Sequence, residues 1–266
     1  MTDADKGAGS LVARVIVNRV WQHHFGRGLV ASPNDFGVSG DRPTHPELLD
    51  WLANDLIEHG WQLKRLHRLI MTSSVYLQSA EHDEGRADID GENRLLWRWT
   101  PRRLEAEAVR DSMLAVSGKL DRTMYGPGTL DLNMTRRSVY FFIKRSQLIP
   151  MMMLFDWPEQ LVSIGQRSTT TIAPQALMFM NSSQGRAYAT AFAAQLPIDS
   201  TEAGVTEAFR LAFARLPSGQ EMQLLSKFVE QQSELYGQQG SGNGRTAALV
   251  DLCQTLMSMN EFVYIE

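Results

Sequence analysis

The stretch TEAGVTEAFRLAFARL (residues 201–216) carries the clearest helical pattern in the chain. Its apolar residues recur every three or four positions, as they do on one face of an α-helix. They are Val205, Ala208, Phe209, Ala212, Phe213 and Leu216. A capping box formed by Ser218 and Glu221 follows and predicts the start of another helix. We therefore expect the C-terminal part of the chain, residues 174–266, to be helical.

The same spacing predicts further helices towards the N-terminus. The expected helices run from Leu11 to Phe25 with Gly26 as the stop, from a Thr44–Glu47 capping box to Gly60, from Leu63 to Ile70, and from Pro101 to Leu120. The polar residues 81–94 are expected to form a surface loop. The predicted fold class is therefore mainly α, in one compact multi-helix domain.

Two segments break the helical pattern. Residues 26–44 and 121–173 are rich in glycine and proline or irregular in pattern, and both are expected to form long ordered loops. Within the second segment, SVYFFIK (residues 138–144) is dense in aromatic and β-branched residues. This run predicts one small β element near residues 137–145, as a short hairpin or a β-bridge to another loop.

The composition excludes several classes of protein. The 266 residues are 43% hydrophobic and 21% charged, as in ordinary globular domains. The net charge of −4 argues against a free-standing nucleic-acid binder. No apolar run approaches the ~18 residues that a membrane helix needs. The single cysteine, Cys253, excludes an internal disulfide, and no motif for a nucleotide or haem is present, so no cofactor is expected.

The organisation of the chain follows from these patterns. Residues 1–10 are small and polar, lack the apolar stretch of a secretory signal, and are expected to be a disordered or truncated end. Residues 11–266 are expected to form a single helical domain with a loop-rich part, 11–173, and a helical part, 174–266. The oligomeric state is left open by the sequence.

Histidines and aspartates offer two alternatives for chemistry. His24 and His45, together with Asp35 or Asp41, are of the residue types that hold a metal ion, but their spacing matches no known metal motif, so no metal site is predicted. The same aspartates, Asp156 or a histidine are candidates for the acid and base of a hydrolase. The catalytic residues, and whether the chain is an enzyme, are left open.

The segment RSTTTIAPQ (residues 167–175) is the most informative for binding. It places one arginine and several hydroxyl groups just before the helix expected to start near Pro174, and the N–H groups at a helix start attract anions. We therefore predict a site for a carboxylate, sulfate or phosphate group. It consists of Arg136, Arg137, Arg145, Arg167, Thr170 and Thr171. The alternative is an ordinary helix start whose arginine pairs with Asp156 or Glu159.

Several stretches together resemble a known family. They are RVIVNRVWQHHFGRGLV, PNDFGVSGDRPTHPELLDWLA, GWQLKRLHRLIMTSSVYLQS, NRLLWRWTPRRLEAEAVRDSMLAVSGKLD, RRSVYFFIKR, FDWP, TTTIAPQALMFMN and NEFVYIE. With these stretches, the chain is similar to the planctomycete-type domain of unknown function 1553 from about Leu11 to Glu266.

The resemblance carries implications about context. It implies the C-terminal part of a larger exported protein, located outside the cytoplasm, in which this domain follows a second domain of unknown function and often a haem-c domain. It implies no activity, cofactor or catalytic residue. This chain itself contains no haem motif and no export signal, and Gly91 stands where relatives usually have proline.

The function predicted from residues and resemblance together is a binding or structural module of a larger exported protein. Its expected partner is an anionic ligand or an upstream domain of the parent protein. The alternative is a hydrolase acting on anionic polysaccharide. No nucleic-acid partner and no membrane span are expected.

Overall fold

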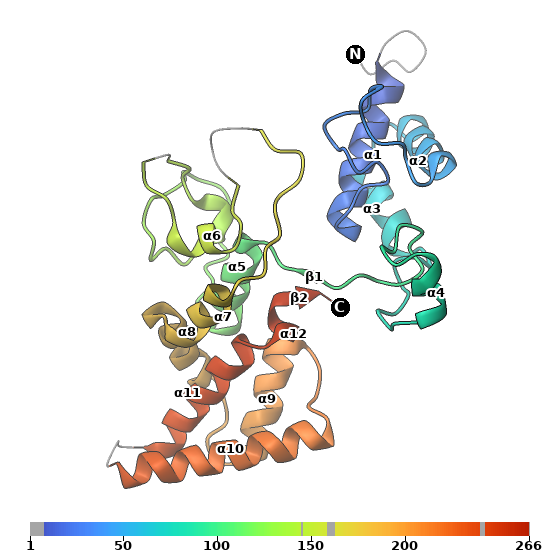
Figure 1. Cartoon of the computed structure of the whole chain (residues 1–266). Helices are drawn as coiled ribbons and strands as arrows, with labels where there is room; N and C mark the ends of the chain where they lie inside the picture. Colours follow the sequence, from blue (N-terminus) through green and yellow to red (C-terminus); the bar gives the residue numbers. More distant parts are fainter. Residues whose placement is uncertain (1–7, 145, 159–162, 240–242, 266) are drawn as a thin grey trace. The chain divides into compact units, whose positions relative to one another are not determined.

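The computed structural model describes residues 8–144, 146–158, 163–239 and 243–265. The fold is mainly α-helical, as the sequence predicts. It comprises two compact units (Figure 1). Unit 1 consists of Met1–Arg102, Ser163–Gln166 and Glu266, and unit 2 of Arg103–Val162 and Arg167–Ile265. The division falls at residues 102 and 103, whereas the sequence places its change of character at residues 173 and 174. The single domain over residues 11–266 stays a prediction.

Unit 1 is built on three helices. Helix α1 (Gly9–Phe25) packs against α2 (Pro46–Glu58) and α3 (Leu63–Met71), and a short helix, α4 (Glu84–Ile89), follows. Their inward faces form one apolar core: Ala13, Val17, Trp21, Leu49, Leu52, Leu56, Leu66 and Ile70. The spacing of these residues is the helical stripe of the sequence, so burial of the stripe accounts for the packing.

The long loop after α1 is fixed by a buried asparagine. Gly26 ends α1 in the left-handed conformation, with a φ of 81°. The side chain of Asn18 then donates to the carbonyl of Val30 at 3.0 Å and accepts from its amide at 2.8 Å. A Cβ atom at Gly28 would lie 2.7 Å from the Asn18 amide nitrogen, so glycine is required where the loop crosses this side chain.

Unit 2 is organised around one buried helix. Helix α11 (Gly244–Met257) packs against α8 (Ser183–Ala193), α9 (Thr201–Phe213) and α10 (Gly219–Gln238), as Figure 1 shows. Its residues Leu249, Leu252, Cys253 and Leu256 are almost completely buried. Burial also raises the pKa of the Cys253 thiol. The bundle therefore has most of the apolar core that the stripe of residues 205–216 predicts. Leu216 is the exception, because α9 ends at Phe213 and the Leu216 side chain is 67% exposed.

Shorter elements complete unit 2. These are α5 (Ala106–Val116), a 3-10 turn (Ser138–Tyr140), α6 (Pro150–Leu154), α7 (Ala173–Asn181) and α12 (Asn260–Val263). Strand β1 (Arg102–Arg103), in which unit 2 begins at Arg103, pairs with β2 (Tyr264–Ile265) in a two-stranded sheet. Every helix among the described residues is too short or too polar to cross a lipid bilayer.

One arginine ties the end of α9 to the start of α10 and to α12. Arg215 donates to both carboxylate oxygens of Glu221 and of Glu261, at 2.6 to 2.9 Å. The hydrogen bonds from Arg215 and from the Ser218 amide lower the pKa of Glu221 to about 2. Glu221 also completes the capping box with Ser218 that the sequence predicts.

Other local predictions need correction. Thr44 does not cap α2, because its hydroxyl donates to the carbonyl of Leu29 and the helix begins at Pro46 after His45. Helix α5 begins at Ala106 rather than at Pro101, which precedes β1. Residues 81–94 contain the helix α4 and not only a loop.

The small β element near residues 137–145 takes the form of bridges. Thr129 pairs with Phe141, and Lys144 with Gln147, as isolated β-bridges. Residues 138–140, the first part of the expected β run, form the 3-10 turn instead. The bridge to another loop is therefore present without a continuous strand, and the Ser138 amide donates to the carboxylate of Asp111 instead of to a partner strand.

Candidate functional site

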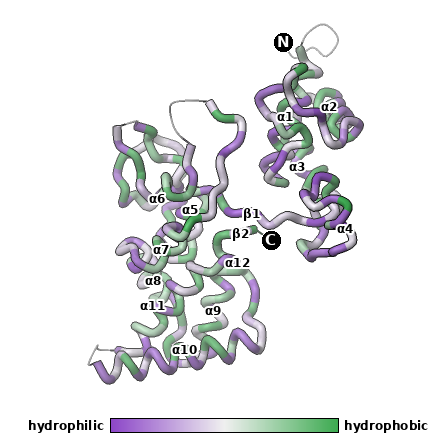
Figure 2. Tube along the Cα trace, in the orientation of Figure 1, coloured by the Kyte–Doolittle hydropathy of each residue, from purple (hydrophilic) through white to green (hydrophobic). Residues whose placement is uncertain are grey.

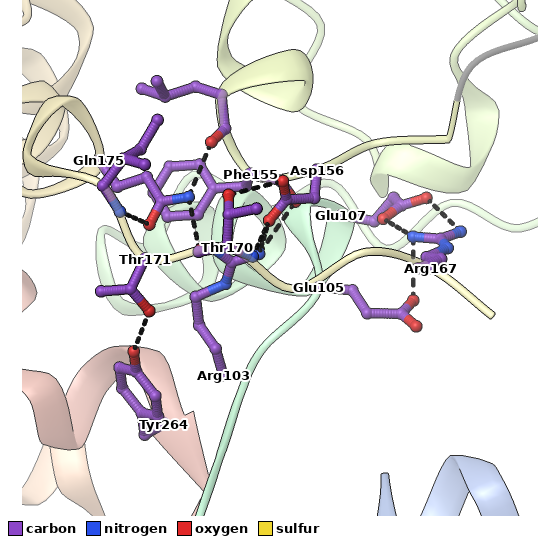
Figure 3. Close-up of polar contacts among 12 residues, drawn as sticks. Arg103, Glu105, Glu107, Phe155, Asp156, Arg167, Thr170, Thr171, Gln175 and Tyr264 are labelled. Atoms are coloured by element: carbon purple, nitrogen blue, oxygen red, sulfur yellow. Dashed lines mark hydrogen bonds and ion pairs between the residues drawn. The ribbon is translucent and has the colours of Figure 1, made fainter. Parts of the chain in front are cut away.

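Arg167, one residue of the predicted anion site, pairs with carboxylates at the start of α5. Arg167 donates to both carboxylate oxygens of Glu107 at 2.7 and 3.0 Å, and its guanidinium lies 3.1 Å from Glu105 (Figure 3). The indole of Trp157 donates to Glu107 at 2.9 Å. Burial alone would raise the pKa of Glu107, but the bonds from Arg167 and Trp157 hold it below its usual range. Arg167 is thus neutralised by carboxylates of its own chain.

The neighbouring hydroxyl groups are also engaged internally. Thr170 donates its amide and its hydroxyl to the carboxylate of Asp156, both at 2.8 Å. Arg103, whose side chain is 4% exposed, donates to the same carboxylate at 2.7 Å. The Thr171 hydroxyl lies 3.4 Å from that of Tyr264 (Figure 3). Residues 167–172 are therefore fastened to α5 and to Asp156 before α7 begins.

Asp156 has an unusual backbone conformation. Its φ is +60°, in the left-handed region that few residues other than glycine adopt. Burial would raise the pKa of this carboxyl, but the bonds from Thr170 and Arg103 lower it overall. The three donors hold a charged carboxylate in place despite this backbone conformation. The sequence alternative that paired Arg167 with Asp156 is wrong in its partner, and Glu159 lies outside the described residues.

The remaining residues of the predicted anion site lie around the loops after α5. Arg137 approaches Asp111 at 4.0 Å, one helical turn beyond Glu107. Arg136 donates to the carbonyls of Thr123, Tyr125 and Pro127. Arg145 lies outside the described residues. The structure therefore brings Arg137 and Arg167 to adjacent turns of α5, each beside a carboxylate, and gives Arg136 a separate role in the loops. Anion binding by these residues stays a prediction.

The buried guanidinium of Arg110 donates hydrogen bonds to these loops. Arg110 on α5 is 2% exposed and donates to the carbonyls of Met134 and Arg136 and to the Ser138 hydroxyl. Its guanidinium also faces the ring of Phe141, 4.7 Å from the centroid. The side chain thus supplies donors that a sheet would otherwise supply to this backbone.

The loops that Arg110 contacts also carry solvent-exposed apolar side chains. We define the loop surface by six apolar residues and three exposed cations: Met124, Tyr125, Val139, Phe142, Ile143, Leu148, Arg122, Arg137 and Lys144. Tyr125 is 81% exposed, Val139 68% and Phe142 56%. The loops lie beside α6 in Figure 1, and Figure 2 shows hydrophobic stretches in them. A strand would have buried alternate residues, so the sequence analysis missed this display.

A signal for the loop surface was present in the sequence. The apolar run of residues 138–143 is flanked on one side by Arg136 and Arg137 and on the other by Lys144 and Arg145. Cations on both sides of an apolar run keep it soluble when it is exposed. The contacts of Arg110 with the carbonyls of Met134 and Arg136, just before this run, connect residues 24 and 26 positions apart and are not visible in the local sequence.

The histidines and aspartates of the metal alternative are not brought together. His24 Nε2 lies 2.8 Å from His67 Nδ1, whereas the ring of His45 bonds the Thr44 hydroxyl. Asp35 accepts from the amide of Gly37. Across the part of the chain that the structure describes, no three histidine, cysteine or acidic side chains are placed to hold a metal ion. The alternative built on His24 and His45 is therefore wrong.

The pair formed by His24 and His67 leads us to expect that the stability of unit 1 depends on pH. Burial, His67, Arg102 and His23 lower the pKa of His24 below its ordinary value of 6.5. The folded state therefore binds fewer protons than the unfolded state as the pH falls below 6.5, so unit 1 loses stability there. We expect the urea midpoint of unit 1 to fall between pH 7.5 and pH 5.5.

Tryptophan fluorescence can follow this transition, because five of the six tryptophans belong to unit 1. In His24→Gln, which keeps a hydrogen-bonding side chain without a titrating group, the midpoint should depend less on pH over this range. An equal pH dependence in His24→Gln and the parent protein would show that His24 is not the titrating group.

Comparison with known proteins places the chain in a family. No curated protein and no solved structure matches it. A family model described as PSD1, protein of unknown function (DUF1553), matches residues 5–229, which is most of the chain. The match confirms the family resemblance drawn from the sequence, over residues 11–229; the stretch NEFVYIE lies beyond the matched residues. The chain belongs to the PSD1 family of proteins of unknown function, DUF1553.

Proposed function

We propose that the chain is a binding module of a larger exported protein and that its loop surface binds an anionic partner. The observation that carries the proposal is the exposure of cationic and aromatic side chains together on a supported loop. Residues 121–149 contain five lysines and arginines and two aspartates, in a chain whose net charge is −4. The segment is therefore a basic region of an acidic protein, and complementary charge attracts an anionic partner.

The cations of the loop surface are more accessible to solvent than the guanidinium of Arg167. The Arg137 side chain is 53% exposed and its distance to Asp111 is 4.0 Å, whereas Arg167 is 33% exposed and bonds Glu107 at two points. An anion at Arg167 would have to displace a carboxylate that is already well placed. At Arg137 and Lys144, an anion meets side chains in contact with water.

The hydrolase alternative receives less support. A general acid at neutral pH needs a carboxyl whose pKa is raised. The pKa of Asp156 is lowered, and three donors already occupy its oxygens. Asp35 is engaged in a turn with Gly37. These contacts favour binding over acid–base catalysis as the function of the chain.

Binding to a soluble polyanion tests the proposal. We expect the parent protein to bind heparin at low salt and to lose affinity as salt is added. Replacing Arg137 and Lys144 together by glutamine should weaken binding about tenfold or more, since each cation near an anionic surface contributes about 1 kcal/mol. Isothermal titration calorimetry gives both the affinity and its dependence on salt.

A matched variant controls for net charge. Lys64 and Arg68 are exposed on α3, and replacing both by glutamine removes the same two charges from unit 1. This control should bind heparin like the parent protein. Absence of heparin binding at low salt, or equal losses in the two double variants, would overturn the proposal.

A further inference from the structure

We infer that the anionic partner of the loop surface is a lipid bilayer that contains anionic phospholipids; this inference rests on the proposed function. The cations of the loop surface could bind any polyanion, so they do not by themselves identify the partner. The apolar residues of the loop surface distinguish the partners, because a soluble polyanion would leave Val139, Ile143 and Leu148 in water. A membrane interface accepts apolar side chains among its acyl chains and cations among its headgroups.

The backbone beneath these side chains is hydrogen-bonded within the protein. The Thr129 amide donates to the carbonyl of Tyr140 at 2.9 Å, and the Phe142 amide donates to the carbonyl of Thr129 at 2.8 Å. The Tyr125 amide donates to the Tyr140 hydroxyl, and its carbonyl accepts from Arg136. Polar backbone groups without partners oppose entry into a lipid phase, so these bonds lower the cost of insertion.

The same bonds fasten the two apolar segments of the loop surface side by side. A Cβ atom at Gly128 would lie 3.1 Å from the carbonyl oxygen of Tyr140 and 3.6 Å from the Cα of Phe142, which shows how closely the segments approach. Tyr125 is held with a φ of +67°, and Arg136 stacks on the Tyr140 ring 3.6 Å from its centroid. The exposed ring of Tyr125 is therefore presented by a backbone fixed before binding.

The charges around the apolar residues suit anionic headgroups. Arg122, Arg137 and Lys144 are exposed. The two aspartates of the segment turn towards the protein backbone, since Asp121 accepts from the Thr123 amide and Asp131 from the Asn133 amide. Long cationic side chains beside apolar ones keep their charges at the level of the headgroups.

A lipid surface fits these observations better than a protein partner does. Protein interfaces concentrate their affinity in anchors that fill pockets on the partner, and tyrosine, tryptophan and arginine are the usual anchors. Here, four of the six apolar residues are non-aromatic, and each is about half exposed or more: Met124, Val139, Ile143 and Leu148. A fluid apolar phase accepts such side chains without requiring matching pockets.

Flotation of the full chain with lipid vesicles tests the inference. We expect binding to vesicles of phosphatidylcholine mixed with phosphatidylglycerol, and weak binding to phosphatidylcholine alone. Phe142→Ser combined with Ile143→Ser should reduce partitioning into the mixed vesicles at least tenfold, because both side chains lose apolar area that the membrane would bury. Leu216→Ser combined with Leu224→Ser removes two apolar residues elsewhere in unit 2 that are at least as exposed, and should have no effect.

Heparin binding separates the two proposals. If the parent protein binds heparin but not the mixed vesicles, the lipid inference is overturned and the proposed function stands. If Phe142→Ser with Ile143→Ser retains heparin binding and loses vesicle binding, the inference is supported. A dimer in sedimentation equilibrium that these two substitutions dissociate, without vesicle binding by the parent, would assign the surface to a second copy of the chain and overturn the lipid inference.

Discussion

Replacing Arg110 by methionine is expected to lower the free energy of unfolding of unit 2 by about 3–5 kcal/mol. Methionine fills much of the same space but donates no hydrogen bond. The carbonyls of Met134 and Arg136 and the Ser138 hydroxyl would lose a donor inside the protein. Each polar group left buried without a partner costs about 1–3 kcal/mol. The loops should therefore separate from α5 before the rest of unit 2 unfolds.

Hydrogen exchange measured by mass spectrometry can locate this effect. In Arg110→Met, amides of residues 129–142 should exchange much faster than in the parent protein, while those of α11 change less. Arg210→Met provides the control, because Arg210 is 59% exposed and pairs with Glu207 at the surface of α9. That substitution removes only an exposed ion pair and should cost much less stability than Arg110→Met. Similar losses of stability in the two variants would contradict the role assigned to Arg110.

Replacing Asp156 by alanine is expected to lower the free energy of unfolding by about 3 kcal/mol. The substitution removes the carboxylate partner of Arg103, whose side chain is 4% exposed, and frees the amide and hydroxyl of Thr170. It also leaves the strain of a positive φ at a residue with a Cβ atom. The loss should appear as faster exchange of the Thr170 amide and a lower urea midpoint.

Asparagine at position 156 is the matched variant. It tolerates the left-handed backbone and keeps one acceptor oxygen, so Asp156→Asn should cost less than Asp156→Ala. This order is expected if the oxygens of residue 156 hold Arg103 and Thr170 in place as hydrogen-bond acceptors. A loss below about 1 kcal/mol in Asp156→Ala would show that Arg103 does not depend on this partner.

Much of the helical fold was predictable because its signals are local. The stripe of residues 205–213, the Ser218–Glu221 capping box and the stop at Gly26 each depend on residues within a few turns of one another. The residues at which helices begin were less predictable from the sequence. Thr44 was available as a cap, but its hydroxyl bonds Leu29, which the local sequence does not reveal.

The candidate site was predictable only in its residue types. Arg167 and Glu107 are 60 positions apart, and Arg103 and Asp156 are 53 apart, so the fold decides these pairs. The same holds for the run at residues 138–144, where the Ser138 amide bonds the side chain of Asp111, 27 positions away, and a 3-10 turn replaces the start of the expected strand. Arginine-rich sequences therefore indicate charge networks, but they do not indicate which cations remain accessible.

The burial of Cys253 gives the C-terminal bundle an internal reporter. The sulfur is 0% exposed in α11, and it is the only thiol of the chain. A thiolate is the reactive form, and burial disfavours it. An alkylating reagent can therefore modify the chain only in molecules whose bundle has opened, so the rate of labelling measures how often unit 2 opens under native conditions.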